Sequence, residues 1–204
     1  MIVAITGMPG AGKSTVAQAL EELGLRRIAM GDMIREETSR RGLPLDDRNM
    51  GAVMQEMRQR YGAGAVAELC LRSLESKRME KGDGTSTPTT KTTEGGTVDA
   101  FVIDGLRSVS EIDVFRKAGE VKLMAVLASP GRRFALLTAR GRTDAPPDLG
   151  SFRVRDEREL SIGIGNAIAL ADEALVNERI APDELGRQAV EIVAGWLKGP
   201  VGSG

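Results

Sequence analysis

The chain has 204 residues, of which 41% are hydrophobic but only 3% aromatic, so its length and composition suit a single α/β domain with an aliphatic core. Its formal net charge of −1 argues against general nucleic-acid binding, which requires a marked surplus of basic residues. The absence of histidine and the presence of a single cysteine, Cys70, exclude histidine acid–base catalysis, a zinc site of the usual kind and an internal disulfide.

The first segment, residues 1–6, is an apolar, β-branched run that predicts a buried strand, and no charged leader precedes it. No apolar run in the chain reaches transmembrane length. We therefore expect a soluble, cytoplasmic protein without a membrane partner.

Residues 7–15, GMPGAGKST, match the phosphate-binding loop pattern of glycine, four residues, glycine, lysine and serine or threonine. They stand between the predicted strand and residues 14–23, whose apolar side chains recur at helical spacing. Loop N–H groups and the helix dipole favour a phosphate anion at such a point. A glycine-rich turn before a surface helix is the simpler alternative. Because strand, loop, Lys-Ser pair and helix are all in register, we predict a nucleoside triphosphate site.

The residue types of this loop match the predicted chemistry. Glycines permit backbone angles and close approaches that side chains would block. Lys13 would reach the β and γ phosphates, and the Ser14 hydroxyl would bind Mg²⁺. ATP and Mg²⁺ are therefore the expected cofactors. The loop residues predicted to bind the nucleotide are Gly7, Met8, Pro9, Gly10, Ala11, Gly12, Lys13, Ser14 and Thr15.

Strand and helix patterns alternate along the remainder of the chain, which favours a parallel sheet covered on both faces. Ser129 and Pro130 supply an N-cap and a first-turn proline for one of the helices. The predicted fold is a P-loop NTPase with three α/β/α layers, a five-stranded parallel sheet and a small helical lid. Further strands are expected at 26–30, 98–104, 121–128 and 173–177, and further helices at 49–61, 65–78, 131–140, 152–170 and 182–197.

Residues 1–198 are predicted to form this single domain. An acceptor-binding region is expected at about 31–80 and the lid at about 138–160. Residues 82–97 are mostly Gly, Ser and Thr and contain nothing suited to a core, so they predict a mobile surface insertion. The last residues, 199–204, are expected to be a flexible tail.

Charged residues follow the predicted strands, at the edge where open α/β sheets bind ligands. Asp32 and Arg35 come after the strand at 26–30, and a spacing of three on a helix would direct both into one cleft. Asp104 ends a buried strand, where it could hold a Mg²⁺ water shell or orient an acceptor hydroxyl. Helix capping and strand termination are the structural alternatives for these two acids.

Arginines gather around the predicted loop at 141–150. Arg140, Arg142 and Arg155 would close over the phosphates and exclude water that could hydrolyse ATP. Surface arginines also pair with nearby acids, and the segment RDEREL offers such partners at helical spacing. The whole set is Arg132, Arg133, Arg140, Arg142, Arg153, Arg155 and Arg158.

The segments GMPGAGKST, MGDMIR and VIDGLR, followed by an arginine-bearing lid and a terminal strand, resemble the nucleoside-monophosphate kinase group of P-loop kinases. Apart from residues 82–97, nearly the whole chain resembles a family of adenylate-kinase-like archaeal proteins that also contain RDEREL, IALAD and VN. The resemblance implies that Arg35 and Arg107 bind the phosphate of the acceptor.

A second resemblance is to dephospho-CoA kinases, which share the phosphate loop, an early acidic residue, an arginine-containing lid helix and a late Ala-Asp…Asn segment. It implies that Asn177 lies near the adenine. It also leaves dephospho-CoA open as an alternative acceptor.

These observations predict an ATP-dependent phosphotransferase that moves the γ-phosphoryl group of Mg·ATP to a small, phosphate-bearing acceptor such as a nucleotide. Asp32 or Asp104 would orient the acceptor hydroxyl or accept its proton, while Lys13 and Arg140 neutralise charge. Ser14 and Asp104 are the predicted metal ligands. The predicted acceptor-binding residues are Asp32, Arg35, Arg107, Arg142 and Arg155, and Arg140 and Asn177 join the loop in binding the nucleotide.

Two rival functions belong to other classes. The first is an ATPase switch that acts on a protein or RNA partner, against which the near-neutral charge weighs in the case of RNA. The second is a module that binds ATP without turnover, which would have little need for an intact set of Lys13, Ser14 and Asp104.

Overall fold

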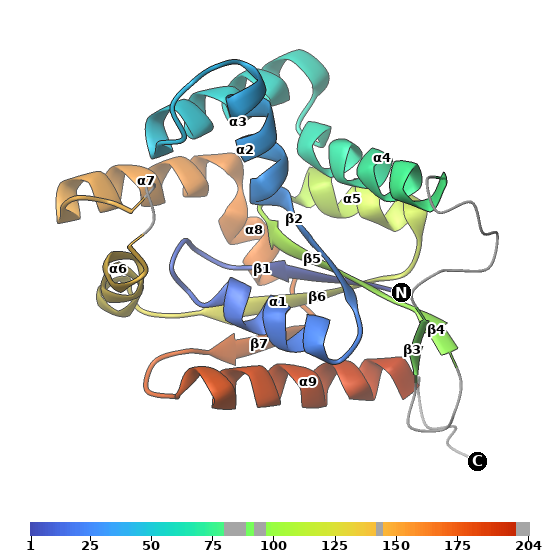
Figure 1. Cartoon of the computed structure of the whole chain (residues 1–204). Coiled ribbons are helices and arrows are strands. Elements are labelled where there is room, and N and C mark those ends of the chain that lie inside the picture. The colour runs from blue at the N-terminus through green and yellow to red at the C-terminus, as the bar shows by residue number, and fades with distance from the viewer. Residues whose placement is uncertain (80–88, 92–96, 142–144, 199–204) are drawn as a thin grey trace.

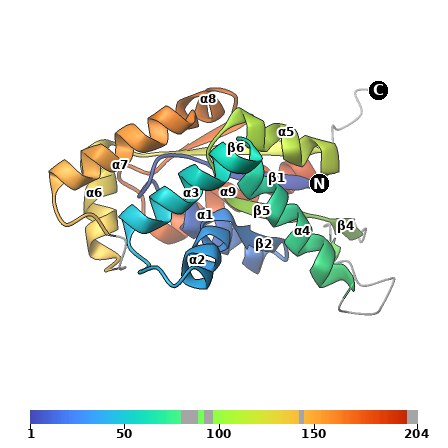
Figure 2. The same ribbon diagram turned by 90° about the horizontal axis from the view of Figure 1, so that it is seen from above.

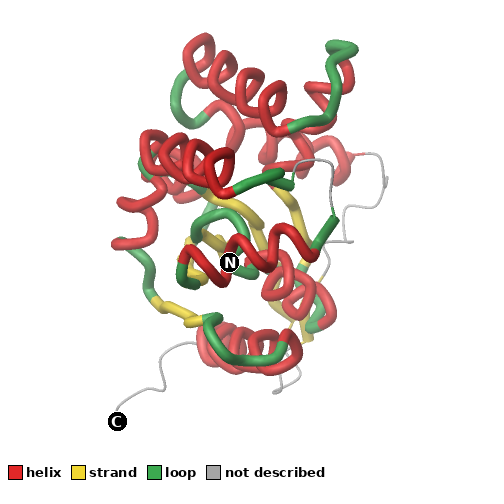
Figure 3. Tube along the Cα trace, turned by 90° about the vertical axis from the view of Figure 1, so that its left-hand side faces the viewer, coloured by secondary structure: helices red, strands yellow, loops and turns green. Residues whose placement is uncertain are grey.

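A five-stranded sheet lies at the centre of the molecule (Figures 1 and 3). In the computed structural model, residues 1–79, 89–91, 97–141 and 145–198 are described. The strand order is β2-β5-β1-β6-β7, and every neighbouring pair is parallel. The expected five-stranded parallel sheet is confirmed. Its strands are β1 (Ile2–Thr6), β2 (Arg26–Ala29), β5 (Phe101–Leu106), β6 (Val121–Leu127) and β7 (Glu173–Val176).

Helices cover both faces of this sheet, which confirms the three-layer arrangement (Figure 3). α1 (Lys13–Glu22) and α9 (Pro182–Lys198) pack on one face and share an aliphatic core with β1. α5 (Val109–Ala118) and α8 (Ile164–Ala169) pack on the other face. Because β1 is central and covered on both sides, all five of its residues are buried, which explains why the first four are all apolar.

The second core extends into α2 (Met30–Arg40), α3 (Asp47–Tyr61) and α4 (Ala65–Met79). Met54 and Met57 are buried in it, as is Cys70, so these residues are packing elements, as their helical spacing predicts. α2 and α3 are therefore packed against the rest of the domain through this shared core.

Two further helices, α6 (Pro130–Ala139) and α7 (Leu149–Ile162), lie beyond the carboxyl end of β6 (Figure 1). Ser129 caps α6 and Pro130 opens it, as expected. In both Figures 1 and 2, α7 lies beside α3, so the segment predicted as a lid faces the segment predicted to bind the acceptor. None of the helices among the described residues is both long and apolar enough to cross a membrane.

Some elements differ from the expectations. The strand expected at 98–104 is divided: β5 begins at Phe101, and β4 (Thr97–Asp99) pairs antiparallel with β3 (Thr89–Lys91) in a separate two-stranded sheet. Within the predicted mobile insertion at 82–97, residues 89–91 form β3 and Thr97 begins β4, while the remainder of the insertion and the tail at 199–204 lie outside the described residues.

Helices also differ. The helix expected at 152–170 is divided at Gly163, whose φ of 104° ends α7 before α8 begins. α5 was absent from the expected elements although its start carries a capping box, in which Ser108 and Glu111 bond to each other's backbone N–H.

Candidate functional site

A cavity of about 780 Å³ opens at the carboxyl ends of β1 and β5, between α1, α2, α6 and α7. It brings together charged residues that are far apart in sequence and were predicted to act together. Arg142 lies outside the described residues. The predicted residues with side chains that line the cavity are Lys13, Ser14, Thr15, Asp32, Arg35, Asp104, Arg107, Arg140, Arg155 and Asn177, and Gly7, Pro9, Gly10 and Gly12 line it as well.

The glycine-rich loop (residues 7–15) connects β1 to α1 and curves around one end of the cavity. Gly7 has a φ of 140°, and a Cβ there would lie 2.2 Å from the Val126 carbonyl oxygen. Gly12 has a φ of 108°, and a Cβ there would lie 2.5 Å from Asn177 Nδ2. Backbone angle and close packing both require glycine. Gly12 is also the N-cap of α1, and no side chain among the described residues caps this helix. The first turn of α1 lines the cavity, so the positive end of its helix dipole faces the cavity.

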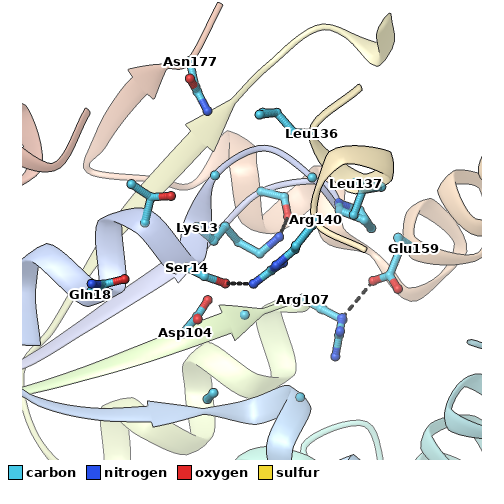
Figure 4. A pocket seen from close by; sticks show the side chains of 18 of the residues that line it. Lys13, Ser14, Gln18, Asp104, Arg107, Leu136, Leu137, Arg140, Glu159 and Asn177 are labelled. Atoms are coloured by element: carbon cyan, nitrogen blue, oxygen red, sulfur yellow. Dashed lines mark hydrogen bonds and ion pairs between the residues drawn. The ribbon is translucent and has the colours of Figure 1, made fainter. Parts of the chain in front are cut away.

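Lys13 folds back over this loop (Figure 4). Its Nζ donates to the carbonyl oxygens of Gly7 at 2.6 Å and Met8 at 3.1 Å. Burial lowers the pKa of Lys13 to about 8, although the nearby Asp104 carboxylate opposes the shift. The ammonium group is therefore short of solvation, and an anion in the loop would restore its preference for the charged form.

Ser14 and Asp104 face the same space beside Lys13 (Figure 4). The Ser14 hydroxyl accepts a hydrogen bond of 3.0 Å from Arg140 Nη2. Asp104 is only 6% exposed, and its Oδ2 accepts from Arg27 Nη2 at 2.6 Å. The arginine that follows α6 and the aspartate that lies within β5 thus both line the cavity beside the glycine-rich loop.

The Ser14 and Asp104 oxygens could supply part of the coordination of a magnesium ion. Hydroxyl and carboxylate oxygens are the donors that Mg²⁺ prefers. Among the described residues, no group of three or more Cys, Asp or Glu side chains could hold a metal ion. Ser14 and Asp104 would therefore complete a shell made mainly of phosphate oxygens and water, rather than form a closed protein site.

The other end of the cavity is lined by charged pairs. On α2, Arg35 Nη1 donates to Asp32 Oδ1 at 2.7 Å, and both residues line the cavity. Arg107 Nε lies 2.9 Å from Oε2 of the buried Glu159 on α7 (Figure 4). The Glu159 charge raises the pKa of Arg107 above its usual value. Each of these two arginines is held in a fixed direction by its carboxylate partner.

α7 contacts α3 through a further set of charges. Arg158 donates to both carboxylate oxygens of Asp47, at 2.9 and 2.8 Å, and Arg155 Nε lies 3.3 Å from the same group. Burial opposes the ionisation of Asp47, but the hydrogen bonds from Arg158, together with the charges of Arg155, Arg158 and Arg107, outweigh it and keep the pKa of Asp47 below its usual value. The predicted lid arginine Arg155 is therefore oriented by α3, which belongs to the segment predicted to bind the acceptor.

Asn177 follows β7 and is buried beneath the glycine-rich loop, where its Nδ2 donates to the Ala11 carbonyl oxygen at 2.9 Å. This contact holds the loop in place. Met8 and Ala11 thus contribute carbonyl groups to the loop's internal bonding, to Lys13 and Asn177 respectively.

Three residues that pair with the predicted ones were not predicted themselves: Arg27, Glu159 and Asp47. The sequence signal that could have identified Arg27 is the presence of an arginine inside an expected strand. Glu159 had another, since it lies one helical turn after Arg155 in RDEREL. Asp47 carried no local signal, because its partners follow it by more than a hundred residues.

Comparisons with known proteins show what this chain is similar to. A family model described as an AAA domain matches residues 6–145. The chain is 39% identical to a UPF0200 protein of Thermococcus onnurineus over 95% of this chain and 96% of the relative. It is 36% identical to a UPF0200 protein of Methanocaldococcus jannaschii over 92% of this chain and 86% of the relative.

Solved structures show the same arrangement of elements. Shikimate kinase from Acinetobacter baumannii, in complex with shikimate, aligns with a TM-score of 0.59 at 14% identity, over 98% of this chain and 95% of that chain. TT1252 from Thermus thermophilus aligns with a TM-score of 0.56 at 21% identity, over 98% of both chains. At these identities the similarity establishes the fold, which is the α/β fold of P-loop kinases.

Proposed function

The chain belongs to the UPF0200 family of archaeal proteins, and from its P-loop kinase-like fold we propose that it is an ATP-dependent phosphotransferase that moves the γ-phosphoryl group of Mg·ATP to a small, phosphate-bearing acceptor. One observation carries this proposal. A single cavity joins the glycine-rich loop to a second group of charged side chains that includes Asp32, Arg35 and Arg107. Phosphoryl transfer requires two substrates side by side, whereas hydrolysis needs no second binding site.

At the donor end, Lys13 and the N–H groups of the loop would bind the polyphosphate. Ser14 and Asp104 would hold Mg²⁺, which neutralises phosphate charge when bound. Arg140 lies within hydrogen-bond distance of Ser14 and would turn to the phosphate oxygens. The chemistry asked of these residues is positioning and charge stabilisation, because the transition state of phosphoryl transfer is loose.

At the acceptor end, Arg35 and Arg107 would bind the acceptor's phosphate in bidentate fashion. Asp32 would orient its reacting group, and Arg155 would close the cavity from α7. We assign the acceptor region to about 31–80 and the lid to about 138–160. A closed lid would exclude water and favour transfer over hydrolysis.

The test is a transfer assay with Mg·ATP against nucleoside monophosphates, nucleosides and dephospho-CoA, with products identified by mass spectrometry. We expect one phosphorylated product with the wild-type protein. Lys13→Ala should lower turnover by about two orders of magnitude or more, on the scale known for removal of one group that stabilises transition-state charge.

Lys117→Ala is the matched control, because Lys117 is exposed on α5 and does not line the cavity. It should leave turnover unchanged. Retained transfer in Lys13→Ala would contradict the role of the loop. Hydrolysis that persists while every acceptor fails would instead favour the ATPase switch.

A further inference from the structure

Arg133 is a buried charge that the proposed chemistry does not use. It lies on α6 and is only 4% exposed. Burying a guanidinium group is costly unless its donors are satisfied and its charge is paired. A buried arginine therefore fixes the positions of the groups that it bonds to.

One of these partners is the glycine-rich loop. Arg133 Nη1 donates to the Pro9 carbonyl oxygen at 3.2 Å. The backbone of α6 lies against the same loop, since a Cβ on Gly10 would be 2.5 Å from the Arg133 carbonyl oxygen. The loop and α6 are consequently packed as one unit.

The other partners belong to α7. The guanidinium forms a bidentate pair with Asp156, with distances of 2.7 Å from Nη1 to Oδ1 and 2.5 Å from Nη2 to Oδ2. It also lies 4.9 Å from the ring centre of Phe152, a cation–π contact on the preceding turn of α7. A single side chain thus joins the loop to the lid helix.

The orientation of α7 determines what the acceptor would meet. Arg155 is next to Asp156 in sequence and lines the cavity, and Glu159 lines it one turn later. Arg158, on the same helix, is bonded to Asp47 of α3. A change in how α7 sits on the loop would move all of these charges together.

We propose that Arg133 is a positioning residue: through Asp156 it fixes α7 relative to the glycine-rich loop, so that nucleotide in the loop orders the α7 charges that face the acceptor. This inference rests on the proposed function, because it requires that the loop bind a nucleotide. It assigns to Arg133 no contact with either substrate.

Hydrogen exchange with ADP and Mg²⁺ tests the inference, because it reads the loop (7–15) and α7 (149–162) separately. In the wild-type protein ADP should slow amide exchange in both segments. In Arg133→Met and Asp156→Asn, ADP should still protect the loop, with a Kd by calorimetry within about threefold of wild type. The ADP-dependent protection of α7 should fall by about tenfold or more, as local opening becomes easier there.

Control variants separate positioning from general stability. Arg153→Met removes an exposed arginine from the same helix and should leave the protection of α7 intact. Arg133→Lys keeps the charge and should restore part of the ADP-dependent protection of α7. In the double variant Arg133→Met/Asp156→Asn, the loss of this protection should be little larger than in either single variant. If Arg133→Met fails to fold, Asp156→Asn carries the test, because asparagine preserves the size of the side chain.

Two results would overturn the inference. Full ADP-dependent protection of α7 in both variants, or no response of α7 in a wild-type protein that binds ADP, would show that the pair only joins two helices. Failure of the wild-type protein to bind ADP would overturn the proposed function, and this inference with it.

Discussion

At the scale of single residues, three arginines that line the cavity are paired with carboxylates. Arg27 forms an ion pair with Asp104, Arg107 with Glu159, and Arg155 with Asp47. A carboxylate that fixes the direction of an arginine reduces the freedom that the arginine loses when an anion binds. The pairs therefore preset the donors of the proposed anion sites.

Glu37 provides a pH-dependent test of such pairing outside the cavity. Its carboxylate accepts hydrogen bonds from Arg40 and Arg41, which lower the pKa of Glu37 to about 2 from its ordinary value of 4.5. Because the folded pKa is below the unfolded one, this stabilisation is present above pH 4.5 and is lost as the pH falls towards 2.

We expect the stability advantage of wild type over Glu37→Gln to be larger at pH 7 than at about pH 3, measured by urea denaturation. Glu36→Gln is the control, since Glu36 is the exposed neighbour on α2. An advantage that stays the same at both pH values would contradict the assignment.

At the scale of elements, α5 depends on the residues that begin it. Ser108 Oγ accepts from the Glu111 backbone N–H at 3.4 Å, and Glu111 Oε2 accepts from the Ser108 N–H at 3.2 Å. Glu111 is buried, and burial raises its pKa even though Arg58 of α3 is bonded to it. The start of α5 is thus tied to α3 as well as capped.

Ser108→Ala should lower the free energy of unfolding by about 1 kcal/mol, the usual cost of removing an N-cap side chain. The urea midpoint should fall without a change in the denaturant slope. Ser110→Ala, at an exposed position in the first turn of α5, should have little effect. Equal losses in the two variants would indicate that the cap contributes nothing specific.

At the scale of the whole molecule, the site lies at the carboxyl edge of the sheet, where the connections that follow neighbouring strands run in different directions. β1 is central, so the glycine-rich loop that follows it is flanked by the end of β5 with Asp104 on one side and by the α6–α7 region after β6 on the other. Ligands of open α/β sheets bind at such points. Nucleotide binding should therefore stabilise the domain as a unit.

ADP with Mg²⁺ at a hundred times its Kd should add about 2.7 kcal/mol to the free energy of unfolding. For a chain of this size that corresponds to a rise in Tm of roughly 5–10 °C. Differential scanning fluorimetry with and without ADP would measure it, and Lys13→Ala should show a much smaller rise. A Tm that does not respond to ADP in wild type would remove the support for a nucleotide site.

The sequence by itself determined the local parts of this protein. The loop at 7–15, the five parallel strands and the N-cap of α6 depend on patterns a few residues long: glycine spacing, β-branched runs and a Ser-Pro start. The same holds for the placement of Asp32 and Arg35 in one cavity, because the two residues are three apart on one helix. Contacts of this kind can be predicted because the backbone conformation alone brings the residues together.

The tertiary structure alone decided which charges that are distant in sequence form pairs. Arg27 lies 77 positions from Asp104, and Asp47 lies 111 from Arg158, so no spacing rule relates them. Arg133 was visible as one arginine among many, and only the packing of α6 against the loop and α7 distinguished it. Long-range pairing depends on how the packed elements come together. The energy of an ion pair is set by its burial and by the distance between its charges, and local sequence patterns predict neither of these.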